Sequence, residues 1–267
     1  MTFSPDTAFA ALPRVFGRET YELLAQCRFC VVGIGGVGSW AVESLARTGV
    51  GHITIIDHDD VTVGNINRQI HAMSTTIGDS KVTLMADRVK QINPECDLEA
   101  IDDFLAEKNL SKYLDQQFDV VIDAIDSIRF KAAMISFCKR NGINIITTGG
   151  AGGRIDPLSI QVCDLSQTWN DALASKVRKR LRTDYGFSRF PKKRFGVECV
   201  FSTEQPMYPD GAGGVTHTKP GVPGASLDCD HGYGSVSGVT GTFGLVAASR
   251  AIKKALTARQ TNAKAPN

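Results

Sequence analysis

A glycine-rich segment between a buried strand and a helix constrains this chain more than any other feature. The segment Gly33-Ile34-Gly35-Gly36-Val37-Gly38 follows an apolar run at 28–32 and precedes residues 39–48, which have helical spacing. Glycines at such a turn let the backbone approach a phosphate, and the helix start supplies free N–H groups and the positive end of its dipole. Asp57 ends the next predicted strand, where a carboxylate can accept hydrogen bonds from ribose hydroxyls. The pattern predicts a nucleotide-binding βαβ unit, with glycines that serve only tight packing as the structural alternative.

The alternation of strands and helices continues along the first half of the chain. We predict strands at 52–56, 98–101, 119–122 and 143–147 and helices at 81–92 and 127–140. The second half predicts strands at 160–163 and 197–201, a mobile loop at about 206–228 rich in Gly and Pro, and a closing helix at 235–256. The expected fold is therefore α/β, a Rossmann-like doubly wound and mainly parallel sheet with a C-terminal extension. We expect a nucleotide-binding domain at 1–165 and a C-terminal lobe at 166–267 packed on it.

Composition excludes several classes of protein. The 267 residues are 42% apolar and 22% charged, which is the balance of a globular protein and not of a disordered or fibrous one. There is no apolar run of about 18–20 residues and no basic segment followed by an apolar core at the start, so we expect neither a spanning helix nor a secretory signal. Seven scattered cysteines make a disulfide framework improbable, and we expect a cytoplasmic location.

The residues after Asp57 indicate which nucleotide is bound. The polar segment from Asp57 to Gln69 includes Arg68, Lys81 opens the next helix, and Asp126 follows the strand predicted at 119–122. Hydride transfer does not need two cations and a metal-binding carboxylate around the phosphates, whereas a triphosphate does. Each residue also has a structural interpretation: Arg68 as a surface ion pair, Lys81 as an ordinary lysine at a helix start, and Asp126 as a helix cap.

These motifs, in this order, resemble the ubiquitin-activating-enzyme-like superfamily, whose bacterial members include ThiF and MoeB. GIGGVGS is followed by D-x-D-x-V-x-x-x-N-x-N-R-Q, the helix-opening lysine and D-A-x-D. The resemblance implies adenylation of a carboxylate with ATP, catalytic roles for Arg68, Lys81 and Asp126, and Mg²⁺ on Asp126. It also implies that Arg14 reaches the ATP of a partner subunit. The implied ATP-binding residues are Gly33, Gly35, Gly36, Gly38, Asp57, Asp59, Asn65, Arg68, Gln69, Lys81 and Asp123.

Further segments resemble the family of tRNA threonylcarbamoyladenosine dehydratases. They are TTGGAGGRIDP at 147–157, RKRLRTDYGF at 178–187, CVFSTE at 199–204 and LDCDHGYGS at 227–235. The resemblance implies ATP-dependent cyclisation of the threonylcarbamoyl group of a tRNA, through an adenylated carboxylate that closes to an oxazolone with release of AMP. The alternative is activation of a ubiquitin-like sulfur-carrier protein. Relatives of that type usually hold zinc with two C-x-x-C pairs. This chain has a single such pair, Cys27 and Cys30, so we expect no zinc. A dinucleotide-binding regulator without catalysis is a third possibility, which Arg68, Lys81 and Asp126 argue against.

The charge of the chain is unevenly distributed. Residues 176–194 hold nine basic residues and one acid, a net charge of +8, so the remainder carries −6 against the overall +2. Such a segment predicts contact with a phosphate backbone, with Tyr185, Phe187 and Phe190 available to stack on bases. The structural alternative is a helix face that is only solvated. The predicted tRNA-binding residues are Lys176, Arg178, Lys179, Arg180 and Arg182. A second basic run extends from Arg250 towards the C-terminus.

Three further expectations concern assembly and chemistry. We expect a homodimer, with an apolar face supplied by Trp40, Ile66 and the small-residue helix that starts near Ser235. Cys229 lies in a glycine-flanked turn and is a candidate covalent or persulfide residue, although ring closure within one substrate needs no enzyme thioester. The sequence leaves open whether a monovalent cation or a cysteine desulfurase/sulfur-acceptor system takes part.

Overall fold

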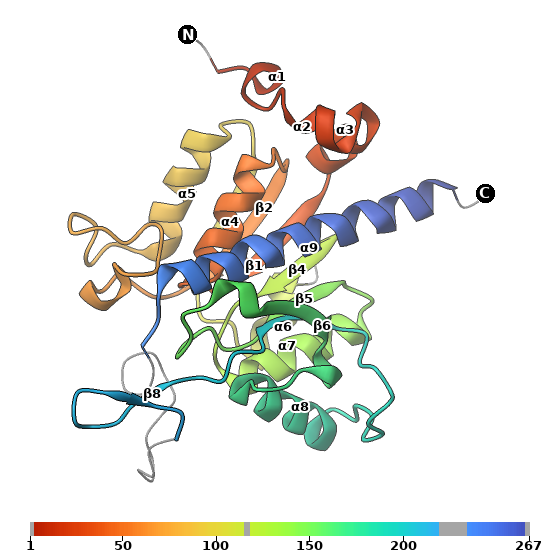
Figure 1. The fold of residues 1–267 in the computed structure, drawn as a ribbon. Coiled ribbons are helices and arrows are strands. Elements are labelled where there is room, and N and C mark those ends of the chain that lie inside the picture. The colour runs from red at the N-terminus through yellow and green to blue at the C-terminus, as the bar shows by residue number, and fades with distance from the viewer. Residues whose placement is uncertain (1–2, 115–117, 219–233, 265–267) are drawn as a thin grey trace.

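A mostly parallel sheet forms the centre of the structure, a computed structural model that describes residues 3–114, 118–218 and 234–264 (Figure 1). Within these residues the main sheet has seven strands in the order β3-β2-β1-β4-β5-β7-β6. All neighbouring strands are parallel except β6 and β7, which are antiparallel. The strands are β1 (Arg28–Val32), β2 (His52–Asp57), β3 (Asp97–Asp102), β4 (Val120–Asp123), β5 (Ile145–Thr148), β6 (Ile160–Asp164) and β7 (Glu198–Ser202). The predicted doubly wound fold is confirmed.

The strand order creates a switch point between β1 and β4. From β1 the chain proceeds outward through β2 and β3, and then returns to place β4 on the other side of β1. The connections after β1 and β4 therefore diverge and leave a crevice at the carboxyl ends of these two strands. Ligands of open α/β sheets bind in this crevice.

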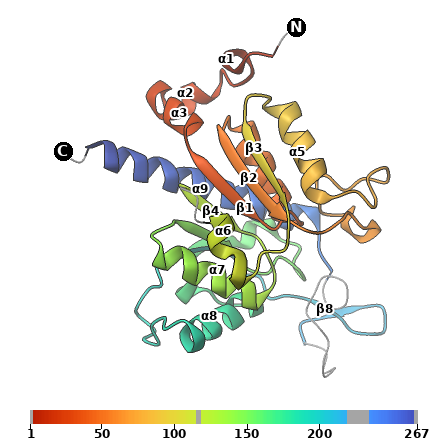
Figure 2. The same cartoon turned by 180° about the vertical axis from the view of Figure 1, so that it is seen from behind.

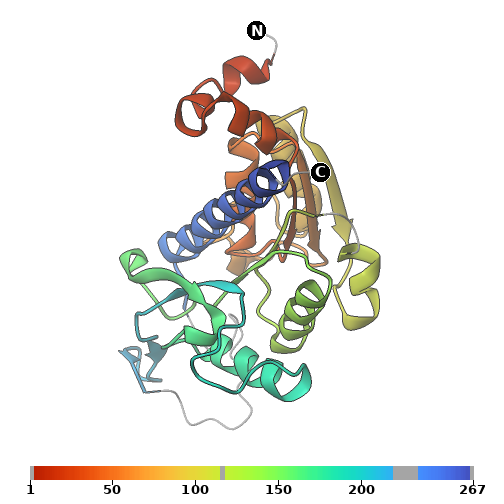
Figure 3. The same ribbon diagram turned by 90° about the vertical axis from the view of Figure 1, so that its right-hand side faces the viewer.

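Helices cover both faces of the sheet, as parallel strands buried on both sides require. Side chains of β1 alternate: Phe29 and Val31 belong to one apolar cluster, and Cys30 and Val32 to the other. The first cluster lies under α4 (Gly38–Arg47), α5 (Lys81–Ile92) and α9 (Ser237–Lys264). The second lies under α6 (Leu110–Leu114), α7 (Ile128–Arg140) and α8 (Ala172–Asp184). Figures 2 and 3 show α9 crossing one face, with α6 and α7 on the other.

The chain after residue 165 contributes directly to this sheet and its faces. Strand β7 pairs with both β5 and β6, and α9 packs against α4 and α3 (Arg18–Ala25). Arg259 of α9 reaches Asp119, to which it donates two hydrogen bonds of 2.8 Å. The N-terminal and C-terminal parts of the chain are therefore held in one framework.

The predicted strands and the four predicted helices are all confirmed, with ends shifted by a few residues except in α9, which continues to Lys264 beyond the predicted end at 256. Five helices lie where no helix was assigned, namely α1 (Pro5–Ala8), α2 (Leu12–Phe16), α3, α6 and α8, and the basic segment begins on α8. The loop expected at 206–228 contains a short hairpin of β8 (Tyr208–Pro209) and β9 (Val215–Thr216), while residues 219–233 lie outside the described part. Asp210 closes this hairpin by accepting the N–H groups of Ala212 and Gly214. Short 3₁₀ turns occupy Val63–Asn65, Glu107–Asn109, Pro157–Ser159 and Leu165–Gln167.

The cysteine pair near β1 is part of the core. Cys27 and Cys30 are both fully buried and unbonded to other cysteines, and burial raises the pKa of the Cys27 thiol to about 12. Such thiols behave as small apolar side chains. Among the described residues, no helix has an apolar stretch long enough to span a bilayer.

Candidate active site

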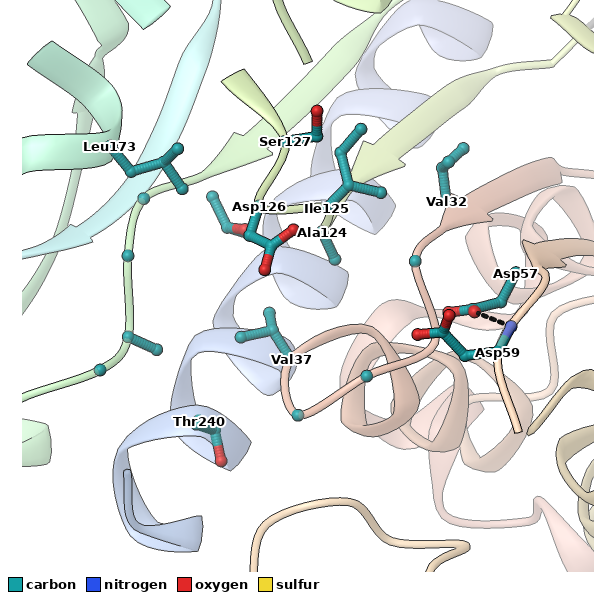
Figure 4. Close-up of a pocket in the computed structure, with 18 of the residues that line it drawn as sticks. Val32, Val37, Asp57, Asp59, Ala124, Ile125, Asp126, Ser127, Leu173 and Thr240 are labelled. Atoms are coloured by element: carbon teal, nitrogen blue, oxygen red, sulfur yellow. Dashed lines mark hydrogen bonds between the residues drawn. The ribbon is translucent and has the colours of Figure 1, made fainter. Parts of the chain in front are cut away.

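A cavity of about 750 Å³ lies at the switch point between β1 and β4. Its walls come from the glycine loop after β1, the end of β2, the loop from Asn65 to Gln69, and the turn after β4. A further wall comes from the segment after β5 and from the first turns of α8, so the cavity extends from the N-terminal half of the sheet to the C-terminal part. Figure 4 shows Asp126 between Leu173 of α8 on one side and Val37 of the glycine loop on the other.

The glycine loop lines the cavity with backbone. Gly33, Gly35 and Gly36 contribute to the wall, and Gly33 has a φ of 85°, which a residue with a side chain rarely adopts. Gly38 does not line the cavity, which corrects its assignment as an ATP-binding residue. A Cβ at Gly38 would lie 1.7 Å from the carbonyl oxygen of Gly33, so this glycine allows the turn to close tightly onto α4.

Two carboxylates at the end of β2 are held by specific partners. The Oδ2 atom of Asp57 accepts the N–H of Ile34 at 2.5 Å, and its Oδ1 atom accepts the N–H of Asp59 at 2.9 Å, the bond drawn in Figure 4. Lys81 is buried at the start of α5 and donates from Nζ to Oδ2 of Asp59 at 2.8 Å. The structure thus brings Asp57, Asp59 and Lys81 to one wall of the cavity, as predicted.

The segment Asn65 to Gln69 presents a cation and an amide to the same cavity. Arg68 donates from Nη1 to the carbonyl oxygen of Gly64 at 2.6 Å and to Asn67 at 3.0 Å, which anchors the guanidinium at the cavity wall. Asn65 is buried and accepts the N–H of Thr62. Gln69 is buried, and its Oε1 atom has no hydrogen-bond partner among the described residues. An orphaned polar atom in the cavity wall is what a polar ligand such as a nucleotide would satisfy.

The two acidic residues after β4 have different surroundings. Asp126 is exposed, lines the cavity and accepts no hydrogen bond from the described residues, so its carboxylate is available to a ligand. Asp123 is fully buried and does not line the cavity, which corrects its assignment to ATP binding. Its Oδ1 atom lies 2.8 Å from Nζ of Lys131, and its Oδ2 atom accepts the hydroxyl of Thr147 at 2.6 Å. Burial raises the pKa of the Asp123 carboxyl, and Lys131 opposes that rise.

The wall after β5 depends on residues to which the sequence analysis gave no role. Arg154 is almost fully buried and donates to the carbonyl oxygens of Gly150, Asn170 and Glu204. Asp171 caps α8 by accepting the N–H of Ala174 at 2.8 Å, and it also accepts the N–H of Gly150 at 3.0 Å. A Cβ at Gly149 would lie 2.0 Å from Asp171, so the glycines of TTGGAGGR permit this contact. The sequence offered one signal for this role, an arginine that follows a glycine cluster. Two of these partners, Asn170 and Glu204, are distant in sequence and could not be inferred from it.

Comparison with known proteins agrees with this geometry. The ThiF family matches residues 9–266. The chain belongs to the ThiF family. Within it the chain groups with the tRNA threonylcarbamoyladenosine dehydratases. The enzyme of that name from Escherichia coli strain K12 is 51% identical over 247 residues, 92% of each chain.

Solved structures of the E. coli dehydratase match both fold and length. The complex with ATP has a TM-score of 0.85 and 46% sequence identity, and the match covers 98% of this chain and 99% of that one. The complex with AMP has the same TM-score and identity, with coverage of 97% and 100%.

In this ThiF-family chain the basic segment 176–194 is divided between internal and exposed residues. Arg178 bonds the hydroxyl of Thr168, Arg180 pairs with Asp184 at 3.1 Å, and Arg182 donates to the carbonyl oxygen of Ser188 at 3.2 Å. These three side chains are half-buried and already have protein partners. The exposed basic residues are Lys176, Lys179, Arg189, Lys192, Lys193 and Arg194.

The aromatic residues of this segment and the second basic run, from Arg250 onward, also include side chains that already have protein partners. Tyr185 donates to Glu107 at 2.8 Å and Phe187 stacks edge-on against Phe195, so neither is free to stack on a base, whereas Phe190 is 77% exposed. In the second run Arg250 and Lys254 both pair with Glu198, and Arg259 pairs with Asp119.

Of the residues expected at a dimer face, Trp40 and the small residues of α9 make contacts within the chain, and Ile66 is exposed. Trp40 packs on Gly241 of its own α9 and donates to the carbonyl oxygen of Arg68 at 3.0 Å, so it stabilises the subunit itself. A Cβ at Gly244 would lie 2.3 Å from the carbonyl oxygen of Val37, so this small residue serves the contact between α9 and α4. Ile66 is 42% exposed.

The structure brings neither Arg14 nor Cys229 into the description of the cavity, for different reasons. Arg14 is exposed on α2 and does not line the cavity of its own subunit. Cys229 lies outside the described residues.

Proposed function

We propose that this chain is an ATP-dependent tRNA threonylcarbamoyladenosine dehydratase. It adenylates the threonyl carboxylate of the hypermodified adenosine at position 37, beside the anticodon, and closes an oxazolone ring with release of AMP. A reaction on tRNA implies a cytoplasmic location. The chain matches relatives of this name over nearly its whole length.

The observation that carries the proposal is the continuity of the cavity. The glycine loop, Arg68, Lys81 and Asp126 form one part, and the glycines at 149–152 with the start of α8 form the other. ATP and an acceptor carboxylate can therefore occupy the same cavity. Holding the two reactants together removes much of the entropic barrier to their reaction.

The nucleotide part supplies positive charge where the triphosphate would lie. We assign the phosphates to the glycine-loop backbone, Arg68 and Lys81, and the ribose to Asp57, with Asp59 holding Lys81 and Asn65 and Gln69 completing the site. The free carboxylate of Asp126 has the oxygen donors that Mg²⁺ prefers, and a bound ion would neutralise charge on the phosphates.

The chemistry proceeds in two steps. An oxygen of the threonyl carboxylate attacks the α-phosphorus of ATP, the bond to the β-phosphate breaks, and pyrophosphate leaves. The carbamoyl oxygen then attacks the activated carbonyl carbon, AMP departs, and the carbamoyl nitrogen loses a proton. Because nucleophile and electrophile are tethered on one nucleoside, the second step benefits from a high effective molarity.

Mass analysis of nucleosides tests this function. The protein is incubated with ATP and tRNA that carries threonylcarbamoyladenosine, and the modified nucleoside should lose the mass of one water with one AMP formed per ring. An unchanged nucleoside, with ATP intact, would contradict the proposal.

The Cys229→Ser variant should retain most of the activity because both reacting groups lie on the substrate. Complete loss of activity in a folded variant would support a covalent step.

We assign tRNA backbone contacts to five exposed basic residues of the C-terminal lobe, 166–267, which we take as the RNA-binding part. They are Lys179, Arg189, Lys192, Lys193 and Arg194. Reversing Lys192, Lys193 and Arg194 to Glu should weaken tRNA binding and reduce the slope of log affinity against log salt by about 2–3, since each duplex phosphate contact contributes about 0.9. Arg178 and Arg182 are unsuitable for this test because they have internal partners. ATP affinity is the control and should be unchanged. Equal slopes for variant and wild type would remove this segment from the RNA site.

We further propose a homodimer. Exposed apolar residues gather on the segment 63–77 and beside the start of α9, where Asn67 bonds the carbonyl oxygen of Ser235 at 2.8 Å. They are Val63, Ile66, Met73, Ile77, Val236 and Leu245. Light scattering should report a dimer that Ile66→Glu weakens, and a wild-type monomer at micromolar concentration would exclude the interface and any role of Arg14 on a partner's ATP.

Metal analysis separates this function from activation of a sulfur-carrier protein. The purified protein should contain no stoichiometric zinc, because Cys27 and Cys30 are core residues with raised thiol pKa values. One zinc per chain would favour the sulfur-carrier reaction. Adding a monovalent cation or a cysteine desulfurase to the tRNA assay would show whether either raises turnover.

A further inference from the structure

Lys176 differs from the other basic residues of the segment 176–194. It lines the cavity, and no other basic residue of that segment does so. Lys176 lies in the second turn of α8, three residues after Leu173, which lines the same wall. Residues three apart on a helix share a face, so Lys176 extends the wall that Leu173 marks in Figure 4.

The other lysine and arginine residues of the cavity have protein partners. Lys81 pairs with Asp59, and Arg154 donates to backbone carbonyl oxygens and lies 3.9 Å from Asp171. Arg68 donates to Gly64 and Asn67. Lys176 makes no hydrogen bond or ion pair with any residue in the described part of the chain. Among the cavity-lining lysines and arginines of the described residues, Lys176 is therefore the one whose ammonium group has all its donors available to a bound anion.

The position of this charge separates it from the nucleotide part. Lys176 is on α8, beyond the glycines at 149–152, whereas Lys81 and Arg68 lie beside β2 and the glycine loop. Asp126 stands between Leu173 and Val37 in Figure 4, so the metal-binding carboxylate lies between the two parts. An acceptor carboxylate that approaches a triphosphate is repelled by it, and a cation on the acceptor side offsets that repulsion.

We propose that Lys176 binds the carboxylate of the acceptor nucleoside and thereby selects RNA that carries this group. This inference rests on the proposed dehydratase function and deepens it. Lys176 recognises the reacting group itself, unlike the neighbouring basic residues, which contact only the phosphate backbone. Lys176 could instead contact the phosphates of ATP or of the RNA backbone. Substituting Lys176 would then lower the affinity for ATP, or for modified and unmodified RNA equally.

Binding measurements with Lys176→Gln test the proposal, with Lys179→Gln as the matched control. Lys179 is exposed on the same helix but does not line the cavity. An anticodon stem-loop RNA is titrated without ATP in two forms, with and without the threonylcarbamoyl group. Wild type should prefer the modified RNA by about 10- to 100-fold, the usual effect of a charge-assisted hydrogen bond. Lys176→Gln should abolish most of that preference, and Lys176→Arg should restore part of it. Lys179→Gln should lower the affinity for both RNAs by the same factor and leave the preference unchanged.

Three results would overturn the assignment. They are an unchanged preference in Lys176→Gln, an equal loss for both RNAs in that variant, or a tenfold loss of ATP affinity. The second result would assign Lys176 to the RNA backbone and the third to the nucleotide. Because RNA binding needs no turnover, this test is separate from the dehydration assay. A wild-type protein that prefers modified RNA through Lys176 but does not dehydrate it would contradict the proposed function alone.

Discussion

The buried pair of Asp123 and Lys131 offers a sharp test of how the fold positions the site. The Lys131 side chain is 2% exposed and the Asp123 side chain 0%, and their charged atoms are 2.8 Å apart. Lys131 also donates to the carbonyl oxygen of Ile125 at 2.8 Å. The lysine therefore holds the turn that presents Asp126 to the cavity, although neither partner of the pair lines the cavity itself.

We expect Lys131→Met to destabilise the protein strongly, because it leaves a buried carboxylate with Thr147 as its remaining side-chain partner. Removing one member of a buried ion pair costs about 3–5 kcal/mol. With a urea slope of about 3 kcal/mol per M, this lowers the unfolding midpoint by about 1–1.7 M. Lys131 normally opposes the rise in the Asp123 pKa that burial causes, so in the variant that pKa rises further. A carboxyl whose folded pKa is raised favours the folded state at low pH, so the loss should grow as pH increases above about 4.

The double variant Asp123→Asn with Lys131→Met separates charge from geometry. It removes both charges and retains an acceptor for Thr147, so we expect much of the stability to return. The bond to Ile125 is still absent, and we expect kcat to remain about 10- to 100-fold low because Asp126 is less well positioned. Denaturant unfolding at several pH values and the nucleoside assay measure the two effects. A single variant within 1 kcal/mol of wild type, or a double variant no more stable than the single one, would refute this reasoning.

Three further predictions follow from single residues. Asp126→Ala should abolish AMP formation while unfolding stays within about 0.5 kcal/mol of wild type, because the carboxylate is exposed and has no described partner; wild-type turnover would remove its assignment to Mg²⁺. Gly38→Ala should cost about 1–3 kcal/mol or more and abolish ATP binding, whereas Gly238→Ala, where a Cβ meets nothing within 4 Å, should be tolerated; equal ATP affinities in these two variants would contradict the packing role. Burial lowers the pKa of His71 from 6.5 to about 4, so as pH falls the unfolded chain takes up a proton before the folded one does. The free energy of unfolding should therefore fall by up to about 3 kcal/mol from pH 6.5 to pH 4. His71→Leu should reduce this dependence on pH, and an unchanged dependence would show that other groups cause it.

Local patterns in the sequence determined the elements and the nucleotide half of the site. The apolar runs predicted every strand of the main sheet, and the start of α5 at Lys81 was placed correctly, because these signals depend on residues adjacent in the chain. The motif residues Asp57, Asn65, Arg68, Lys81 and Asp126 all reach the cavity, since parallel strands end at one edge of the sheet. The family resemblance added the reaction, which spacing alone does not specify.

Only the tertiary structure decided the roles that depend on distant partners. Asp123 and Asp126 are three residues apart and were given neighbouring roles, yet one is buried against Lys131 and the other is free, because a strand residue that points into the core cannot reach the crevice. Trp40 and the glycines of α9 were predicted to contribute to a subunit interface, and the structure shows that they contact each other within one chain. Arg154 and Asp171 act on the glycine wall through partners that lie up to fifty residues away. Burial and long-range pairing are properties of the packed molecule, and a one-dimensional pattern does not specify which of several similar polar residues the core encloses.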